Sequence, residues 1–353
     1  MAVGQGARPG SGTAAGPVAG AAAGPGFGRH APRPGGLWRR TPPAIFPPIM
    51  GLFGLGLGWR RGAAAFGMSP GPAADMVHAV AEAILGAVTL LFLFALLAYG
   101  AKVLRRPGVV AEDLRILPGR AGVAALVLSL YLLALVAVQY RPAMTGNLLI
   151  GALVAHGALV LLLLRGYARG PAEQRRVTPV WHLNYVGGII AALAALKLGW
   201  QGCALILFAA STLIAVAIWA VSLGQLLAER VSAPLRPLLA IHLSPAALIG
   251  AVAAGLGMAT VAQGFAVLSA VILAVLVLRA RWLTAAGFSP LWGAFTFPLA
   301  ATAGLWLTLG GRWHLPGALT LLAATVVVPW IAARILRLWA GGQLAQRTNA
   351  ATA

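Results

Sequence analysis

Charged residues are scarce in this sequence, and their scarcity decides its class. Only 9% of the 353 residues are charged, whereas 60% are hydrophobic. A soluble domain carries about 25% charged residues. So few charges cannot cover a surface that faces water, and we therefore expect most of the exterior to face lipid.

Acidic residues and cysteine are rarer still. The only cysteine, Cys203, excludes a disulfide within the chain. Of six acidic residues, only Glu82 is predicted to enter a membrane segment, near its end. A proton pump built on intramembrane carboxylates is therefore poorly supported. Phosphate-binding glycine loops, paired carboxylates and metal-ligand spacings are also missing, so no cofactor is expected and the chain is not predicted to be an enzyme.

Ten apolar runs approach the length of about 20 residues that crosses a bilayer. They cover residues 44–59, 77–101, 116–138, 143–164, 178–199, 203–226, 237–259, 261–278, 289–309 and 315–333. Backbone groups in hydrocarbon must be hydrogen-bonded internally, and the alternating pattern of a membrane barrel is absent. The predicted fold class is an all-α polytopic membrane protein, with the short, glycine-rich first run as its least regular span.

The runs repeat with a regular period. Prolines head alternate runs at Pro47, Pro118, Pro179, Pro237 and Pro298, separated by 71, 61, 58 and 61 residues. A repeat of this length is typical of a repeated supersecondary unit. We expect five helical hairpins, and five equivalent hairpins leave a central axis that can serve as a pore.

Basic residues fall mainly on one side of the predicted topology. Five of the 26 lie on the far side, namely Arg60, Arg61, Arg141, Lys197 and Arg312, and the remaining 21 lie on the side of both termini. This bias is the positive-inside pattern, which predicts cytoplasmic termini. The net charge of +20 is thus explained by topology, and no nucleic-acid partner is expected.

The same topology divides the chain into three parts. Residues 1–40, rich in Ala, Gly and Pro, are predicted to be a disordered cytoplasmic extension. Residues 41–340 form the transmembrane domain and residues 341–353 a short cytoplasmic tail. The expected location is a bacterial-type inner (plasma) membrane, with several passes through the lipid bilayer.

Odd-numbered and even-numbered runs differ in composition. Three odd runs open with a hydroxyl residue and proline, and several contain interior proline or glycine, such as Pro245 and Pro298. Most even runs are plain apolar sequence. Broken helices suit a water-filled or protein-lined setting, so we expect the odd helices to form an inner ring. Close packing through small residues is the alternative explanation.

His242 is the histidine that deserves separate consideration, because it precedes the interior Pro245 by three residues. It either faces an aqueous pore or is satisfied by a neighbouring helix. Histidines near the predicted spans also raise the possibility of a haem- or metal-dependent membrane protein. No pair of them has a convincing ligand spacing.

Residues 288–298, Phe-Ser-Pro-Leu-Trp-Gly-Ala-Phe-Thr-Phe-Pro, are the most specific string. They resemble the ninth helix of the tellurite-resistance/dicarboxylate transporter family, which includes the plant slow anion channels. Residues 47–51, the pair Thr178-Pro179 and the pair Ser244-Pro245 resemble the starts of other helices in that family. The similarity extends over about residues 43–345.

The resemblance implies ten helices in five hairpins around a pseudo-fivefold central pore, assembled as a homotrimer. It implies that Phe297 plugs the pore; the alternative is a phenylalanine packed in the core. The candidate pore-lining residues are His242, Asn184, Phe53, Thr296, Pro245 and Pro298. The chain departs from many bacterial relatives at His182-Leu183-Asn184, where they have Leu-Pro, so the bend of this helix is either lost or made differently.

The resemblance also implies the transported class. A channel or transporter for small inorganic or organic anions is the first hypothesis. The alternative is a proton-coupled C4-dicarboxylate carrier or a sulfite-type oxyanion exporter, for which His242 is the internal titratable candidate.

Overall fold

The structure, a computed structural model, describes residues 38–66 and 68–353, with the side chains of residues 63–65 left aside. Within these ranges all regular structure is helical and no strand occurs. The extension predicted over residues 1–40 lies outside the described residues up to position 37.

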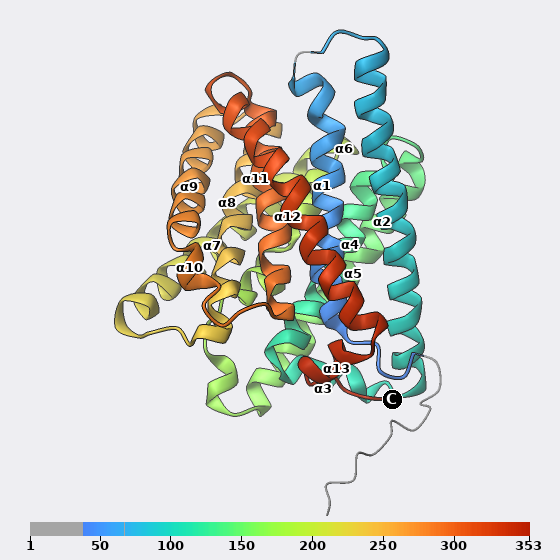
Figure 1. Cartoon of the computed structure of the whole chain (residues 1–353), viewed down its shortest axis with the longest axis vertical. Helices are drawn as coiled ribbons and strands as arrows, with labels where there is room; N and C mark the ends of the chain where they lie inside the picture. The colour runs from blue at the N-terminus through green and yellow to red at the C-terminus, as the bar shows by residue number, and fades with distance from the viewer. Residues whose placement is uncertain (1–37, 67) are drawn as a thin grey trace, which may run out of the picture. The chain divides into compact units, whose positions relative to one another are not determined.

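The helices follow one another with short connections (Figure 1). In chain order they are η1 (Pro43–Ile45), α1 (Phe46–Ala65), α2 (Pro72–Arg105), α3 (Gly108–Arg115), α4 (Leu117–Ala137), α5 (Pro142–Arg169), η2 (Ala172–Arg175), η3 (His182–Val186), α6 (Gly188–Lys197), α7 (Gln201–Ala228), η4 (Ala233–His242), α8 (Leu243–Gly255), α9 (Ala259–Leu278), α10 (Ala280–Leu283), η5 (Pro290–Phe295), α11 (Thr296–Leu309), η6 (Gly311–Trp313), α12 (His314–Ala340) and α13 (Gln343–Arg347).

Eight helical stretches in the described part are long and apolar enough to cross a membrane. They contain α2, α4, α5, α7, α8, α9, α11 and α12. The remaining two predicted spans correspond to α1 and to η3 with α6. Arg60, Arg61 and several glycines reduce the apolar character of α1, and the π-helical turn η3 leaves α6 only 10 residues long. Ten spans therefore stay a prediction, whereas a polytopic helical membrane protein is established.

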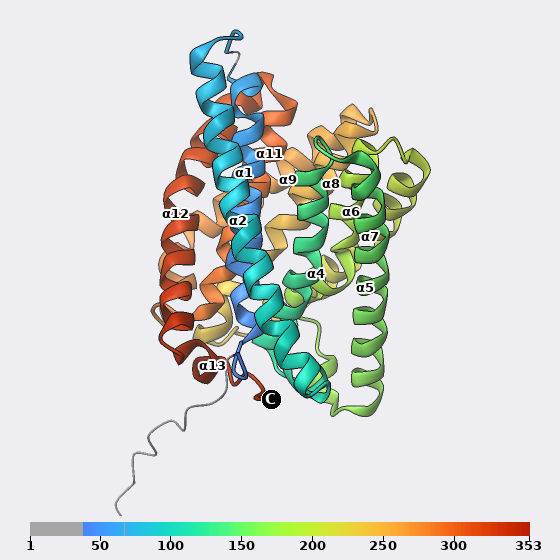
Figure 2. The same cartoon turned by 90° about the vertical axis from the view of Figure 1, so that its right-hand side faces the viewer.

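Neighbouring long helices pair in sequence: α1 with α2, α4 with α5, α6 with α7, α8 with α9, and α11 with α12. The first member of each pair also contacts the first members of two other pairs. These contacts run from α1 to α4, α6, α8, α11 and back to α1, and so form a closed circuit. We call these five helices, with the short helices that precede them, the inner segments. Figure 2 shows α2, α5 and α12 beside them.

Burial separates the two sets of helices. In the apolar 18-residue stretches of the spans that contain α4, α8 and α11, 78%, 67% and 61% of the residues are buried. The corresponding shares for α2, α5, α7, α9 and α12 are 28%, 28%, 28%, 17% and 39%. The second members of the pairs therefore carry most of the exposed apolar surface, as lipid-facing helices do.

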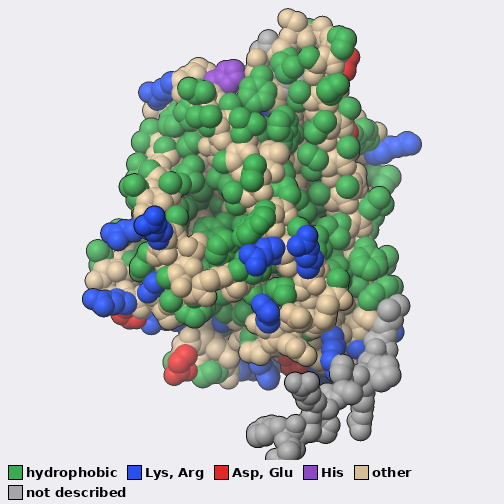
Figure 3. Space-filling model, viewed as in Figure 1, with side chains coloured by type: hydrophobic (Ala, Val, Ile, Leu, Met, Phe, Trp, Pro, Cys, Tyr) green, Lys and Arg blue, Asp and Glu red, His purple; other side chains and the backbone are tan. Residues whose placement is uncertain are grey.

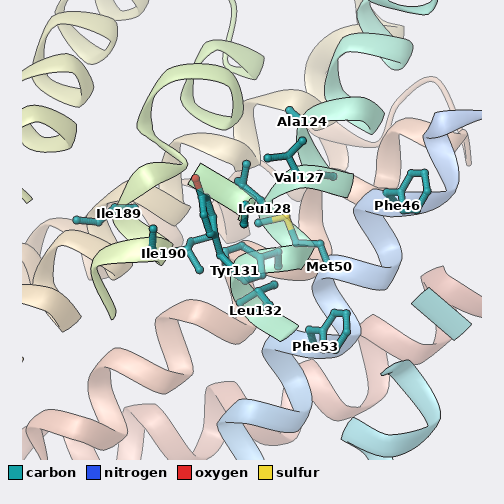
Figure 4. Packing of buried hydrophobic residues seen from close by; sticks show 14 of the residues in the cluster. Phe46, Met50, Phe53, Ala124, Val127, Leu128, Tyr131, Leu132, Ile189 and Ile190 are labelled. Atoms are coloured by element: carbon teal, nitrogen blue, oxygen red, sulfur yellow. The ribbon is translucent and has the colours of Figure 1, made fainter. Parts of the chain in front are cut away.

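The inner segments share one core. Met50 and Phe53 of α1 lie beside Leu128 and Tyr131 of α4, with Ile190 of α6 on the far side of α4 (Figure 4). All five side chains are at most 2% exposed. Contacts of this kind hold the inner segments together without any contribution from charge.

Four inner segments change helix type near their beginning. A 3₁₀ turn precedes α1, α8 and α11, and the prolines Pro47, Pro245 and Pro298 stand in the first turn of the α-helix that follows. Proline has no N–H to donate and bends a helix that contains it. In the segment that lacks the Leu-Pro pair, the π-helical turn His182–Val186 marks the change instead. This segment therefore also changes helix type near its beginning, through a π-helical turn and without the Leu-Pro pair.

A buried ion pair fastens one end of the molecule. Lys102 Nζ of α2 lies 2.8 Å from Asp113 Oδ2 of α3, and both side chains are fully buried. Lys102 also donates to the Thr41 carbonyl at 3.2 Å, and Tyr99 donates to Asp113 Oδ2 at 3.0 Å. The backbone N–H of Ala351 completes the carboxylate with a 2.9 Å bond to Oδ1. The predicted tail, residues 341–353, is thus tied to the transmembrane helices.

We expect Asp113→Asn to lower the free energy of unfolding by about 3–5 kcal/mol, because it leaves Lys102 charged and unpaired in a buried site. Thermal unfolding in detergent measures the change. Glu112→Gln is the matched control, since Glu112 pairs with Arg106 at 2.5 Å on the surface, and it should leave the melting temperature unchanged. Equal shifts for the two variants would contradict the assignment.

Candidate functional site

Two narrow cavities, which we call the axial cavities, lie among the inner segments. The first, about 40 Å³, is lined near the beginnings of the segments, by residues such as Ala44, Pro118, Leu183, Leu238 and Pro290. The second, about 20 Å³, is lined by residues farther along the same segments, among them Leu128, Val186, Ile190 and Leu248. A cavity needs roughly 10–15 Å³ to hold one water molecule. Each cavity therefore accommodates water, and neither accommodates a hydrated ion.

Phe297 stands where the two cavities meet. It lines both of them, together with Met50, Leu183, Ile241 and Ser244. These five residues come from four different inner segments, and the ring of Phe297 is 5% exposed. Phe297 is therefore one of five residues that lie between a cavity near the segment beginnings and a cavity deeper along the segments.

Glycines of α1 make room for the Phe297 region of α11. A Cβ atom added at Gly54 would lie 3.1 Å from the Phe297 ring, and one added at Gly51 would lie 2.2 Å from Thr296 Oγ1. Thr296 Oγ1 donates to the Gly293 carbonyl at 2.7 Å and lies 3.3 Å from the Pro47 carbonyl of α1. The start of α11 is thus pressed directly against the α1 backbone.

The lining of the axial cavities is almost entirely apolar. Among their lining residues, Ser244 and His182 are the only polar side chains, and none is acidic or basic apart from that histidine. Neither Ser244 nor His182 was singled out from the sequence as lining an axis. A constriction that is this narrow and apolar excludes hydrated ions, because they are too wide for it and because water does not wet its walls.

The predicted site residues fall into two groups. Phe297, Pro298 and Pro245 line the axial cavities. Thr296 points its hydroxyl at backbone carbonyls instead. Phe53 lies outside the lining of both cavities, fully buried against Phe92 with ring centroids 5.8 Å apart.

Asn184 and His242 also lie off the axial lining. Asn184 is fully buried, and its side-chain amide has no hydrogen-bond partner. His242 lines a separate cavity of about 340 Å³, which we call the side cavity, between the end of α7, residues 176–179 and the start of η4. His242 Nδ1 lies 3.0 Å from Nε2 of His182. The two histidines stand 60 residues apart, so the repeat period was the signal in the sequence that connects them.

Charge is distributed unevenly over the surface. Figure 3 shows Lys and Arg gathered in the lower part of the view, toward the end where Figure 1 places α3 and α13, beneath a mostly hydrophobic middle. In the described part of the chain, no group of three or more His, Cys, Asp or Glu side chains is arranged to hold a metal ion.

The apolar helices, the closed circuit of inner segments and the narrow cavities among them define a multi-pass helical membrane protein. The chain matches the voltage-dependent anion channel (SLAC1) family over residues 40–339, and it belongs to that family. The resemblance stated from residues 288–298 is thereby confirmed, and an anion channel or transporter is the general class that the family supports. No curated protein matches the chain.

We expect Gly51→Ala to lower the melting temperature markedly, because the new methyl group would overlap Thr296 and force α1 away from α11. Gly86→Ala in α2 is the matched control, since nothing lies within 4 Å of its added Cβ, and it should be neutral. Thermal unfolding of both purified variants measures the two melting temperatures and tests this expectation. A Gly51 variant as stable as the wild type would show that α1 and α11 do not need this contact.

Proposed function

We propose that the chain conducts small anions along the axis enclosed by its five inner segments, and that the Phe297 ring closes this path. In this proposal all ten predicted spans cross the membrane as five hairpins around a pseudo-fivefold pore. The observation that carries it is the place of Phe297, which lines both axial cavities. The circuit of contacts among α1, α4, α6, α8 and α11 supports the enclosing ring.

The lining fits an anion better than a cation. No Asp or Glu belongs to the lining of either axial cavity, so nothing there attracts a cation. The first turns of α8 and α11 contribute Ser244 and Phe297 to this lining, and the prolines there break the regular helix, so in this proposal backbone dipoles supply a weak attraction for anions. Weak attraction of this kind lets an ion enter without trapping it.

The orientation follows from the basic residues. We place both termini in the cytoplasm, with the first axial cavity toward that side, because Lys and Arg concentrate there. A basic rim raises the local concentration of anions at a pore mouth. The exposed apolar helices α2, α5, α7 and α9 then face lipid or, in the homotrimer expected from the family resemblance, neighbouring subunits.

We expect Phe297→Ala to raise anion conductance about tenfold or more, since removing the ring opens the narrowest point between the cavities. Currents through purified protein in planar bilayers, with chloride, nitrate, sulfite and malate in turn, measure the effect and rank the anions. Phe53→Ala is the matched control, because Phe53 is a buried phenylalanine that lines neither cavity.

The control should keep the wild-type current despite its loss of packing. Equal currents for Phe297→Ala and the wild type, with both proteins folded, would overturn the gating role. If Phe297→Ala leaves the malate or sulfite flux unchanged, that result would favour the carrier or exporter alternative.

A further inference from the structure

The histidine pair joins two cavities that are otherwise separate. His182 lines the second axial cavity, beside Phe297 and Ser244. His242 lines the side cavity. The two rings meet edge to face, with centroids 5.0 Å apart and Nε2 of His182 3.0 Å from Nδ1 of His242. Because the histidines are only 3% and 9% exposed, this contact lies inside the protein.

The outer nitrogens of the pair are left without partners. Neither Nδ1 of His182 nor Nε2 of His242 has a hydrogen bond, although both atoms are buried. Buried polar atoms in proteins are nearly always paired, so an unpaired one asks for an explanation. By the cavities that the two residues line, the order is side cavity, His242, His182, axial cavity, with one hydrogen bond between the rings and one unpaired nitrogen on each ring. This arrangement is the one that a proton relay requires.

The surroundings leave the pair as the titratable link between the cavities. On its axial side, α4, α1 and α11 present Leu128, Met50 and Phe297, and η4–α8 presents Ser244. From α7, Trp219 packs against His182 and donates to the His242 carbonyl at 3.3 Å. No carboxylate belongs to the axial lining.

The charged groups stand on the other side, around the side cavity. Its lining includes the charged residues Arg176, Glu229 and Arg230 and the hydroxyl residues Ser222 and Thr178, together with His242. Arg176 already pairs with Glu229 at 2.5 Å. The hydroxyl oxygens of Ser222 and Thr178 are buried and unpartnered, so water in this cavity would find hydrogen-bonding groups beside His242.

We propose that His242 and His182 pass protons between the side cavity and the axial cavity, so that anions crossing the membrane are accompanied by protons. A proton from the side cavity binds His242 Nε2, and the proton on His242 Nδ1 moves to His182 Nε2. His182 then releases the proton on its Nδ1 to the axial cavity. One proton enters and one leaves, and both rings end in the other tautomer, so each ring must regain its starting tautomer before the next proton passes. The coupling to anions rests on the proposed function, whereas the relay itself does not.

The control for this proposal is a third buried histidine. His156 is 7% exposed, but both of its ring nitrogens are occupied. Nδ1 lies 3.1 Å from the Tyr131 hydroxyl, and Nε2 lies 2.9 Å from the Asn184 carbonyl. His156 lines neither axial cavity nor the side cavity. A glutamine here removes a buried imidazole of the same kind without touching the relay.

The experiment uses the full chain in proteoliposomes under valinomycin and potassium, so that voltage is fixed. A chloride gradient is imposed, chloride flux is followed with a chloride electrode, and proton flux is followed with trapped pyranine. We expect chloride-driven proton flux in the wild type. His242→Gln and His182→Gln should each reduce it about 100-fold, since glutamine hydrogen-bonds but does not shuttle protons. His156→Gln should retain it.

Proton flux is also measured without a permeant anion, with gluconate on both sides, in the Phe297→Ala protein. The relay predicts a proton flux that His242→Gln removes. Chloride flux without proton flux in the wild type would overturn the proposal, and so would proton flux that survives both glutamine substitutions. Proton flux that depends on both histidines, with no chloride flux, would sustain the relay and reject the proposed anion pathway.

Discussion

The structure depends on the contact between α1 and α11, the first and last inner segments. Their closeness rests on Gly51 and Gly54, where a side chain would overlap Thr296 or press on Phe297. Without that contact the four remaining contacts would leave the five inner segments as an open series from α1 through α4, α6 and α8 to α11. With it the inner segments form a closed circuit, and the axial cavities lie among them. The glycines that weaken α1 as a span are the ones that close the circuit.

Closure explains why the chemistry of the site is so sparse. The axial lining holds Ser244 and His182 as its only polar side chains, so in the proposed channel selectivity would come from the width of the path and from charge at its mouth. Strong binding groups would slow an ion rather than pass it. The buried ion pair between Lys102 and Asp113 lies away from these cavities and serves to hold the helix ends together.

The sequence predicted the helical hairpins and the division into inner and outer helices, whereas the role of Phe297 stays a proposal. Period and composition act locally, so they can be read from residues: the prolines Pro47, Pro245 and Pro298 do stand where helix type changes. The features that the sequence did not predict depend on contacts between residues that lie far apart along the chain. The pairing of His182 with His242 joins segments 60 residues apart, and the lining by Ser244 depends on which other segments surround it. The π-helical turn His182–Val186 had no signal in the local sequence pattern.

The central claim is that the inner segments enclose a lumen and that Phe297 divides it. Cysteine accessibility tests this most directly, because Cys203→Ser removes the only native thiol. In that background Leu248→Cys, which lines only the second axial cavity, should react slowly with a water-soluble, negatively charged methanethiosulfonate added on the side of the first cavity, and about tenfold faster once Phe297→Ala is added. Ser269→Cys, buried where Ser269 accepts a bond from Trp306, should stay unreactive in both. A Leu248→Cys labelling rate that is the same with and without the Phe297 ring would contradict the account.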